Sequence, residues 1–257
     1  MTAIEPQAIP ARRLEWRRAK VRQVITETSR VKSLLVDVAA WPGHLPGQHV
    51  DVRLTDEDGY QAQRSYSIAS PAEDRWVALT VERVENGEVS PYLVDEIRTG
   101  DQFELRGPIG GYFVWTVATG GPLCLIAAGS GIAPLMAMLR HRDRQSAGVP
   151  SVLLYSARST EDVIYGKELA AMARRDPDLR VAGALTRKQP EGWTGYRRRV
   201  DKAMLADACF PADRTPRIYV CGPTPFVEDV SSFLIELGHD ASMIKTERFG
   251  PTGGPAS

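Results

Sequence analysis

The chain has 257 residues, a length that fits two small domains. Hydrophobic residues make up 43% and charged residues 25%, as in soluble globular proteins, and 32 basic residues balance 32 acidic ones, so the net charge of +0 offers nucleic acid and anionic lipid no general attraction. The 3 cysteines are widely spaced without a Cys-x-x-Cys pair, which excludes a disulfide framework, a cysteine-bound metal site and an iron–sulfur cluster built by this chain alone.

No segment predicts secretion or a membrane span. The N-terminal residues lack the apolar run of a signal peptide, and the longest apolar runs, such as 122–128, are much shorter than the roughly 20 residues of a membrane helix. We therefore expect a cytoplasmic protein that does not insert into membranes. Residues 1–13, which contain two prolines and no periodic pattern, are expected to form a flexible tail.

Residues 14–118 consist of short alternating or β-branched runs that turn residues separate. One short helix is expected at 90–97. Many short strands with a single helix predict an antiparallel β-barrel of Greek-key type. The predicted strands are 19–25, 31–38, 49–54, 63–68, 76–84 and 102–106.

Residues 119–249 change to apolar strands that alternate with helices. This alternation predicts an α/β domain with a parallel sheet, in which ligands bind at the carboxyl ends of the strands. We place the domain boundary between 117 and 122 and a C-terminal tail at 250–257. The predicted strands are 123–128, 151–156, 180–185 and 217–221, and the predicted helices are 132–144, 167–174, 201–207 and 225–237.

Two strand ends in the second half carry candidate ligand-binding turns. Gly129, Ser130 and Gly131 follow an apolar strand and lead into a helix whose first turn contains Pro134, so free N–H groups and the helix dipole would face a phosphate. A tight turn without a ligand remains the alternative, because a short glycine motif is weak evidence. The other strand ends in Cys221, Gly222 and Pro223, which places a thiol at the sheet edge. Cys124 and Cys209 are expected to be small buried apolar residues, and Cys221 has the same alternative.

The first half holds a polar strand, 63–68, in which Arg64 and Tyr66 share one face and Ser65 and Ser67 the other. An arginine can bind a pyrophosphate with two parallel hydrogen bonds, and an aromatic ring can stack on a planar heterocycle. A hydroxyl can form a hydrogen bond with a ring nitrogen. A surface arginine and a core tyrosine are the alternative. Further on, Gly87, Glu88, Val89 and Ser90 open the predicted short helix with Ser90 as its N-cap, which makes a second candidate anion site. The glycine-rich loop 107–113 either lets a ligand approach or simply connects the domains.

Together these motifs, in this order and at this spacing, resemble the ferredoxin–NADP reductase superfamily over residues 14–249. The resemblance implies a flavin-binding barrel followed by a nicotinamide-nucleotide domain, with the two rings meeting between them. It matches Arg64 to the arginine that binds the flavin diphosphate, Tyr66 to the aromatic residue packed on the isoalloxazine and Ser67 to the hydroxyl near its N5. Residues 87–90 resemble the segment that holds the pyrophosphate of FAD, which favours FAD over FMN.

The resemblance also assigns residues of the second half. Cys221 resembles the thiol beside the nicotinamide, and Glu247 and Phe249 resemble an acidic and aromatic pair in which the aromatic ring covers the flavin until nicotinamide displaces it. Because the chain continues past Phe249, we expect a looser lid than a terminal tyrosine. The implied catalytic residues are Ser67, Cys221 and Glu247. The implied ligands of FAD are Arg64, Ser65, Tyr66, Ser67, Gly87, Glu88, Val89, Ser90 and Phe249, and those of the nicotinamide nucleotide are Gly129, Ser130, Gly131, Pro134, Cys221, Gly222 and Pro223.

Basic residues follow the strand ends of the second half, and arginines suit the 2′-phosphate of NADPH whereas an acidic residue suits a hydroxyl. Arg158, Arg187 and Arg199 resemble phosphate-binding positions of NADPH-using members. We therefore expect NADPH, while Glu161 and Asp162 near the first cluster keep NADH as the alternative.

The implied reaction passes hydride from NADPH to FAD and then electrons to a separate acceptor protein. This acceptor would be a ferredoxin, a haem protein or an oxygenase component, since the chain cannot build its own cluster. Basic residues near the N-terminus either dock an acidic carrier or form a solvated strand edge: Arg12, Arg13, Arg17, Arg18 and Lys20. The alternative functions are reduction of a small molecule, such as a ferric chelate or free flavin, and a flavin-binding regulatory module without turnover.

Overall fold

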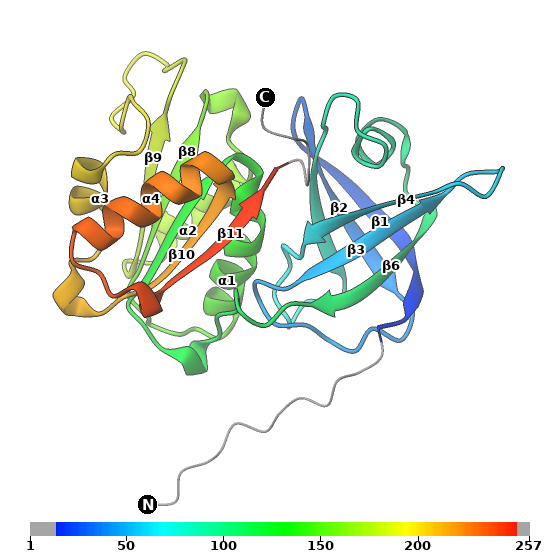
Figure 1. Ribbon diagram of the computed structural model, residues 1–257, viewed down its shortest axis with the longest axis horizontal. Coiled ribbons are helices and arrows are strands. Elements are labelled where there is room, and N and C mark those ends of the chain that lie inside the picture. Colours follow the sequence, from blue (N-terminus) through cyan, green and yellow to red (C-terminus); the bar gives the residue numbers. More distant parts are fainter. Residues whose placement is uncertain (1–13, 251–257) are drawn as a thin grey trace, which may run out of the picture.

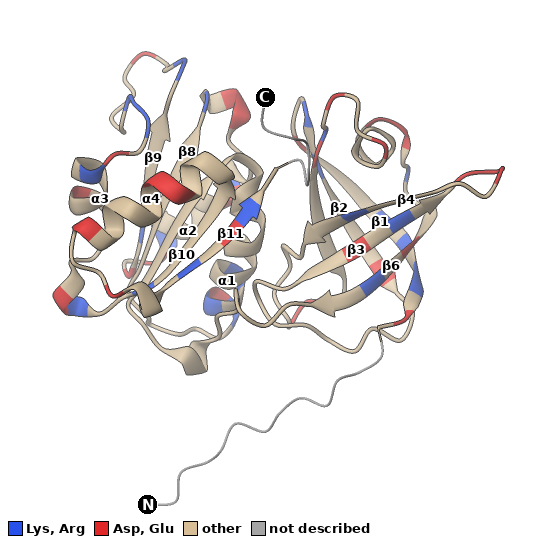
Figure 2. Cartoon of the chain, in the orientation of Figure 1, with Lys and Arg blue, Asp and Glu red and all other residues tan. Residues whose placement is uncertain are grey.

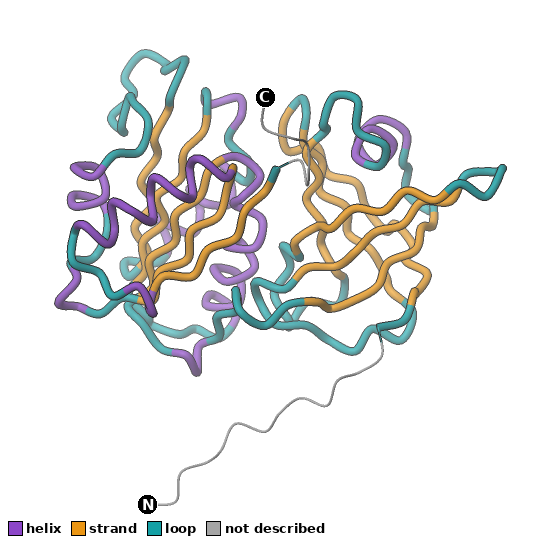
Figure 3. The backbone as a smooth tube through the Cα atoms, in the orientation of Figure 1, coloured by secondary structure: helices purple, strands orange, loops and turns teal. Residues whose placement is uncertain are grey.

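The computed structural model describes residues 14–250, which form two lobes lying side by side (Figure 1). The predicted tail at 1–13 and residues 251–257 of the predicted C-terminal tail lie outside the described residues. Strands dominate the first lobe, and helices pack against the sheet of the second (Figure 3). Within residues 14–250, no helix combines the length and the apolar character needed to span a membrane.

The first lobe is a 6-stranded antiparallel sheet in the order β4-β3-β6-β1-β2-β5. Its apolar side chains alternate along the strands and fill the interior, as Leu34 and Val36 of β2 do. The sheet closes where Ile68 and Leu79 form an antiparallel bridge, so the predicted antiparallel barrel is confirmed. The strands are β1 (Trp16–Thr28), β2 (Val31–Val38), β3 (His49–Thr55), β4 (Gln61–Ser67), β5 (Val77–Glu82) and β6 (Gln102–Ile109).

The short helix of the barrel differs from the prediction. It is a single π-helical turn, Tyr92–Glu96, preceded by Pro91, and no side chain caps its N-terminus. The Ser90 hydroxyl instead accepts a hydrogen bond from the Val84 N–H at 3.0 Å. The predicted N-cap role of Ser90 is therefore wrong, because the hydroxyl is used to close the preceding turn.

The second lobe is a 5-stranded parallel sheet in the order β11-β10-β7-β8-β9, and this confirms the predicted α/β domain. The central strands are buried along their length, since helices cover both faces. Helix α1 begins at Ile132 and ends at Arg144, as the sequence predicts. The elements are β7 (Leu123–Ala128), α1 (Ile132–Arg144), β8 (Ser151–Ala157), α2 (Gly166–Arg175), β9 (Leu179–Leu185), α3 (Lys202–Ala208), β10 (Arg217–Pro223), α4 (Thr224–Glu236) and β11 (Ile244–Phe249).

An apolar core joins the two lobes. Val31, Ala69 and Ala78 of the barrel lobe belong to the same buried cluster as Leu135 of α1 and Leu125 of β7. This cluster continues through the connecting segment, where the Trp115 side chain is fully buried. The lobes are thus packed on each other rather than linked by an exposed tether.

Polar contacts reinforce this junction. The Tyr165 hydroxyl, at the start of α2, is hydrogen-bonded to Thr80 of β5, and Thr80 lies 2.9 Å from the Ser33 hydroxyl. Arg140 of α1 donates to the Ala69 carbonyl at 2.8 Å and holds Glu168 with both ends of its guanidinium. Buried hydrogen bonds of this kind fix the relative orientation of the two lobes, because breaking one leaves a desolvated polar group unpaired.

Candidate active site at the domain interface

The parallel sheet reverses its strand order between β7 and β10. The chain moves from β7 to β8 and β9 on one side and returns to β10 and β11 on the other. The carboxyl ends of β7 and β10 therefore lie at the topological switch point, where open α/β sheets bind their ligands. The loop Gly129–Gly131 leaves β7 here, and Gly129 has a φ of +55°. A Cβ on Gly131 would lie 2.4 Å from the Cys221 carbonyl oxygen, so this position requires glycine.

Strand β11 brings Glu247 beside Cys221. The two residues are directly paired in the parallel ladder, and Phe249 is paired with Pro223 two residues further on. Cys221 is fully buried, whereas Phe249 is partly buried against the apolar core that joins the lobes. The predicted thiol, carboxylate and aromatic ring therefore come from one sheet edge.

A hydrogen bond across the domains completes this group. The Ser67 hydroxyl, at the end of β4 in the barrel, donates to Glu247 Oε1 at 3.0 Å, although the residues are 180 positions apart. The other oxygen of the carboxyl group, Oε2, is buried and has no hydrogen-bond partner among the described residues. A buried carboxyl with a free oxygen can accept a partner or transfer a proton there.

The surroundings change the acidity of both groups. Burial raises the pKa of Glu247 to about 7, and the Ser67 hydrogen bond opposes this only in part. Burial and the neighbouring Glu247 raise the pKa of Cys221 well above its usual value. Cys221 is consequently a neutral thiol that shapes the site, while Glu247 changes protonation near neutral pH.

We expect Glu247→Gln to remove a pH-dependent loss of stability. Because the pKa of Glu247 is raised when folded, its contribution is fully present below about 4.5 and is lost as the pH rises through about 7. At pH 5, where less than about 1 kcal/mol of this stability has been lost, the variant should unfold only slightly above the parent protein. At pH 8 it should unfold at a clearly higher temperature, because the difference there is of order 3 kcal/mol. Thermal unfolding at both pH values measures this.

The control for this prediction is Glu228→Gln, an exposed carboxylate of α4. Its unfolding temperatures should parallel those of the parent protein at both pH values. A Glu247→Gln variant that is equally destabilised at pH 5 and pH 8 would contradict the role of Glu247 ionisation.

On the barrel side, Arg64 lies half-exposed on β4. Its guanidinium donates to Glu88 Oε2 at 2.6 Å, and the Tyr60 hydroxyl donates to the other oxygen of Glu88 at 2.5 Å. Both contacts hold the pKa of Glu88 below its usual range. The fork that was predicted to bind a diphosphate therefore carries an internal carboxylate, and it is accessible enough to exchange that partner for another anion.

The other residues of the polar strand divide between the site and the barrel. Tyr66 packs against the barrel core, and its burial raises its pKa. Ser65 shares the face of Ser67, but its hydroxyl donates to Asp51 Oδ1 at 2.6 Å, and Asp51 also binds Arg106. Of the two serines, the structure brings only Ser67 to the domain interface.

The segment 87–90 lies against β4 through Glu88. Val89 is fully buried in the barrel core, which anchors the segment. A Cβ on Gly87 would lie 3.1 Å from both Ser90 Oγ and the Val84 carbonyl oxygen, so the turn is tightly closed. This arrangement keeps the segment beside Arg64, as a shared anion site requires.

The loop Gly129–Gly131, which the sequence predicts to bind a nucleotide, makes a contact that the sequence did not suggest. The Ser130 hydroxyl donates to Glu82 Oε2 of β5 at 2.7 Å, across the domain interface. Within the same loop, the Gly129 carbonyl accepts from the Tyr155 hydroxyl at 3.1 Å. Pro134 is buried in the first turn of α1, where its missing N–H costs the helix no hydrogen bond.

The end of β10 is equally compact. A Cβ on Gly222 would lie 2.9 Å from the Phe226 ring, and Pro223 forms the N-cap of α4. Gly222 and Pro223 therefore turn the chain directly into a helix next to Cys221.

The predicted phosphate-binding arginines lie at the ends of neighbouring strands. Arg158 follows β8 and Arg187 follows β9, and the Arg158 carbonyl accepts from the Arg187 N–H at 2.9 Å. Both side chains, and that of Arg199 before α3, are exposed and form no ion pair within residues 14–250. Lys188, by contrast, lies 3.3 Å from Glu161. The backbones of Arg158 and Arg187 are thus neighbours at adjacent strand ends, and no hydrogen bond or ion pair within residues 14–250 joins Arg199 to them.

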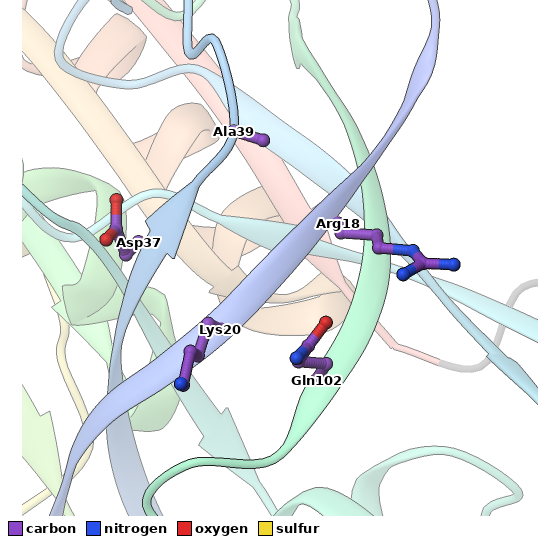
Figure 4. A pocket seen from close by; sticks show the side chains of 5 residues that line it. All are labelled: Arg18, Lys20, Asp37, Ala39 and Gln102. Atoms are coloured by element: carbon purple, nitrogen blue, oxygen red, sulfur yellow. The ribbon is translucent and has the colours of Figure 1, made fainter.

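The described basic residues near the N-terminus, Arg17, Arg18 and Lys20, lie on β1 of the barrel. Arg12 and Arg13 are outside the described residues, and Arg17 donates to the Ala40 carbonyl at 2.9 Å. Arg18 and Lys20 border a hollow of about 230 Å³ on the outer face of the barrel (Figure 4), and both signs of charge are spread over the two lobes (Figure 2). The residues that line the hollow are Arg18, Lys20, Asp37, Ala39 and Gln102. The mixed charges give this surface no clear preference for an acidic partner.

The described residues contain no group of three or more His, Cys, Asp or Glu side chains that could hold a metal ion.

Comparisons with known proteins identify both domains. Residues 20–114 match the family model of the oxidoreductase FAD-binding domain, and residues 125–232 match that of the oxidoreductase NAD-binding domain. The FAD/NAD-binding domain of nitric oxide dioxygenase from Vibrio cholerae has a TM-score of 0.82 at 27% identity and covers 91% of this chain and 99% of that one. The Amycolatopsis cytochrome P450 reductase GcoB has a TM-score of 0.80 at 27% identity, and the match covers 93% of this chain and 71% of that one.

Among curated relatives, the glycine betaine monooxygenase reductase subunit of Pseudomonas aeruginosa is 35% identical over 209 residues, which cover 80% of this chain and 56% of the relative. The flavohemoprotein of Bordetella pertussis is 30% identical over 253 residues, which cover 94% of this chain and 62% of the relative. The chain thus spans little more than half the length of these relatives. The predicted FAD and nicotinamide-nucleotide cofactors are confirmed by the two domain matches, and the chain belongs to the ferredoxin–NADP reductase superfamily, with an FAD-binding barrel followed by an NAD-binding domain.

Proposed function

We propose that the protein is an FAD-dependent NAD(P)H reductase that passes electrons to a separate one-electron acceptor, of the kind found as an oxygenase component or a ferredoxin. The observation that carries this proposal is the Ser67–Glu247 hydrogen bond across the two domains, with Cys221 beside it. Relatives named as the reductase subunit or component of glycine betaine and propane monooxygenases, and as the electron transfer component of toluate dioxygenase, support the choice of acceptor.

The residues present suit both cofactors. Arg64 offers an exposed guanidinium fork for the flavin diphosphate once Glu88 releases it, and the segment 87–90 lies beside this fork. The Gly129–Gly131 loop offers the nucleotide diphosphate free N–H groups at the start of α1. Glu247 Oε2 is buried without a hydrogen-bond partner among the described residues, so it is available as a polar contact at the junction where the two rings would meet.

When bound, the flavin accepts a hydride from the nicotinamide and releases the electrons one at a time. The protein supplies position and protons. The Ser67 hydroxyl donates to Glu247 Oε1 in the structure. When Glu247 is protonated, this hydrogen bond can reverse, so that the carboxyl proton is donated to Ser67 Oγ and the Ser67 hydroxyl proton is free to be donated into the junction. Buried Cys221 and partly buried Phe249 exclude water from this place.

The direct test is anaerobic titration of the purified protein with NADPH and with NADH, followed by extraction of the flavin. We expect extracted FAD and bleaching of the flavin absorbance by at least one nucleotide. A flavin that neither nucleotide bleaches would support a regulatory module instead. Turnover with ferric chelates or free flavin that added ferredoxin or oxygenase component does not increase would support a small-molecule reductase.

We further propose that NADPH is preferred, because Arg158 and Arg187 follow adjacent strand ends, are exposed and form no ion pair within residues 14–250. Arg187→Ala should raise the KM for NADPH about tenfold and leave that for NADH nearly unchanged, since only NADPH carries the 2′-phosphate. Steady-state kinetics with both nucleotides measure the ratio.

Lys188→Ala is the matched control for this prediction. Its side chain adjoins Arg187 in sequence but lies beside Glu161, so it should change the NADPH to NADH ratio less than twofold, roughly the scale of an exposed ion pair. An unchanged ratio in Arg187→Ala would contradict the phosphate role.

A further inference from the structure

The proposed nucleotide loop already holds a carboxylate. Ser130, in the middle of the Gly129–Gly131 turn, donates its hydroxyl to Glu82 Oε2 at 2.7 Å. Glu82 is the last residue of β5, and it belongs to the other domain, 48 residues earlier in the chain. An anion of the protein itself therefore stands at the turn where an anion of the nucleotide is expected.

No positive charge neutralises this carboxylate within residues 14–250. Glu82 is partly buried and forms no ion pair there, and the next residue, Arg83, pairs instead with Asp95 at 2.7 Å. The Glu82 charge is felt by the Tyr155 hydroxyl, which itself donates to Gly129: burial raises the pKa of Tyr155, and Glu82 and Asp162 add to this. The charged side chains that act on the Tyr155 hydroxyl beside the loop, Glu82 and Asp162, are thus both negative.

We propose that Glu82 determines how weakly the nucleotide loop binds the diphosphate of a nicotinamide nucleotide, an inference that rests on the proposed function. An incoming diphosphate must take over the Ser130 hydroxyl and is repelled by the carboxylate that it displaces. The same repulsion speeds release of the oxidised nucleotide after hydride transfer, because weaker binding of one family of ligands is expressed mainly as faster dissociation. Glu82 acts on affinity for both NADPH and NADH, whereas the exposed arginines distinguish between them.

A purely structural role for the contact makes a different prediction. If Glu82 serves only to tie β5 to the loop, its loss would lower the unfolding temperature and would leave nucleotide binding unchanged or weaker. Glutamine retains a carbonyl oxygen that can accept from Ser130 and removes the charge. Glu82→Gln therefore separates repulsion from the hydrogen bond.

The experiment measures binding of NADP⁺ and NAD⁺ to the FAD-loaded protein by calorimetry at several NaCl concentrations, since the oxidised nucleotides bind without turnover. We expect Glu82→Gln to bind both nucleotides about fivefold or more tightly than the parent protein. Its affinity should also fall more steeply with salt, because salt screens a repulsion in the parent that the variant lacks. Glu85→Gln, an exposed carboxylate three positions away, is the control and should match the parent.

The outcomes are distinct. The role of Glu82 would be overturned if Glu82→Gln bound the nucleotides equally or more weakly than the parent protein, or if its affinity depended on salt in the same way as that of the parent does. Nucleotide binding by the parent protein would still support the proposed reductase function in that case. Absence of binding by parent and variant alike would overturn the proposed function together with this inference.

Discussion

Replacing Arg64 by alanine is expected to weaken FAD binding by the apoprotein at least about a hundredfold, because two charge-assisted hydrogen bonds to the diphosphate are lost. The guanidinium is the group on β4 with the geometry for such a bidentate contact, and it is held in place by Gln63 and Glu88. The dissociation constant is measured by titrating FAD into the apoprotein at fixed salt and monitoring the quenching of flavin fluorescence.

Two comparisons make this result specific. Arg22→Ala, which removes an exposed arginine paired with Asp37 elsewhere on the barrel, should bind FAD like the parent protein. FMN has a single phosphate, so Arg64→Ala should lose less affinity for FMN than for FAD. Undiminished FAD binding by Arg64→Ala would remove this residue from the flavin site.

Ser67→Ala is expected to slow reduction of the flavin by NADPH about a hundredfold, the usual effect of removing one hydrogen-bond donor aimed at a reacting atom. Binding of FAD should change little, because the Ser67 hydroxyl contacts Glu247 at the domain interface rather than the predicted diphosphate site. Stopped-flow measurement of flavin bleaching under anaerobic conditions gives the rate, and a fluorescence titration gives the affinity.

The second serine of the same strand tests which hydroxyl acts. Ser65 donates to Asp51 inside the barrel network, so Ser65→Ala should affect the rate of reduction far less than Ser67→Ala does. Equal rates for Ser67→Ala and the parent protein would rule out its role at the junction.

The fold was predictable where burial imposes a clear period. The strands β7 and β8 are mostly apolar and are buried because helices cover them on both faces. Helix α1 is bounded by a glycine turn and a polar C-terminal turn. Strand β11 was not predicted as a strand. Its residues include Lys245, Glu247 and Arg248, whose charges mask the pattern, and it is formed by pairing with β10, which a local sequence pattern does not report.

The candidate site shows the same limit. The resemblance to a known family pointed to Ser67, Cys221 and Glu247, but the hydrogen bond between the first and the last depends on how two domains dock. The contact between Ser130 and Glu82 depends on that docking too, and a glutamate at the end of a strand carries no local signal of it. The N-cap role predicted for Ser90 failed because a backbone N–H of the preceding turn took its hydroxyl.

The apolar core shared by the two lobes bears on how this protein can be divided. A fragment that contained only the barrel would expose Ala69 and Ala78 to water, and the other fragment would expose the matching surface of α1. Separating the halves would also break buried hydrogen bonds, such as the one between Thr80 of the barrel and Tyr165 of the second lobe. The smallest folding unit that can be expressed alone or fused to another protein is therefore the pair of domains.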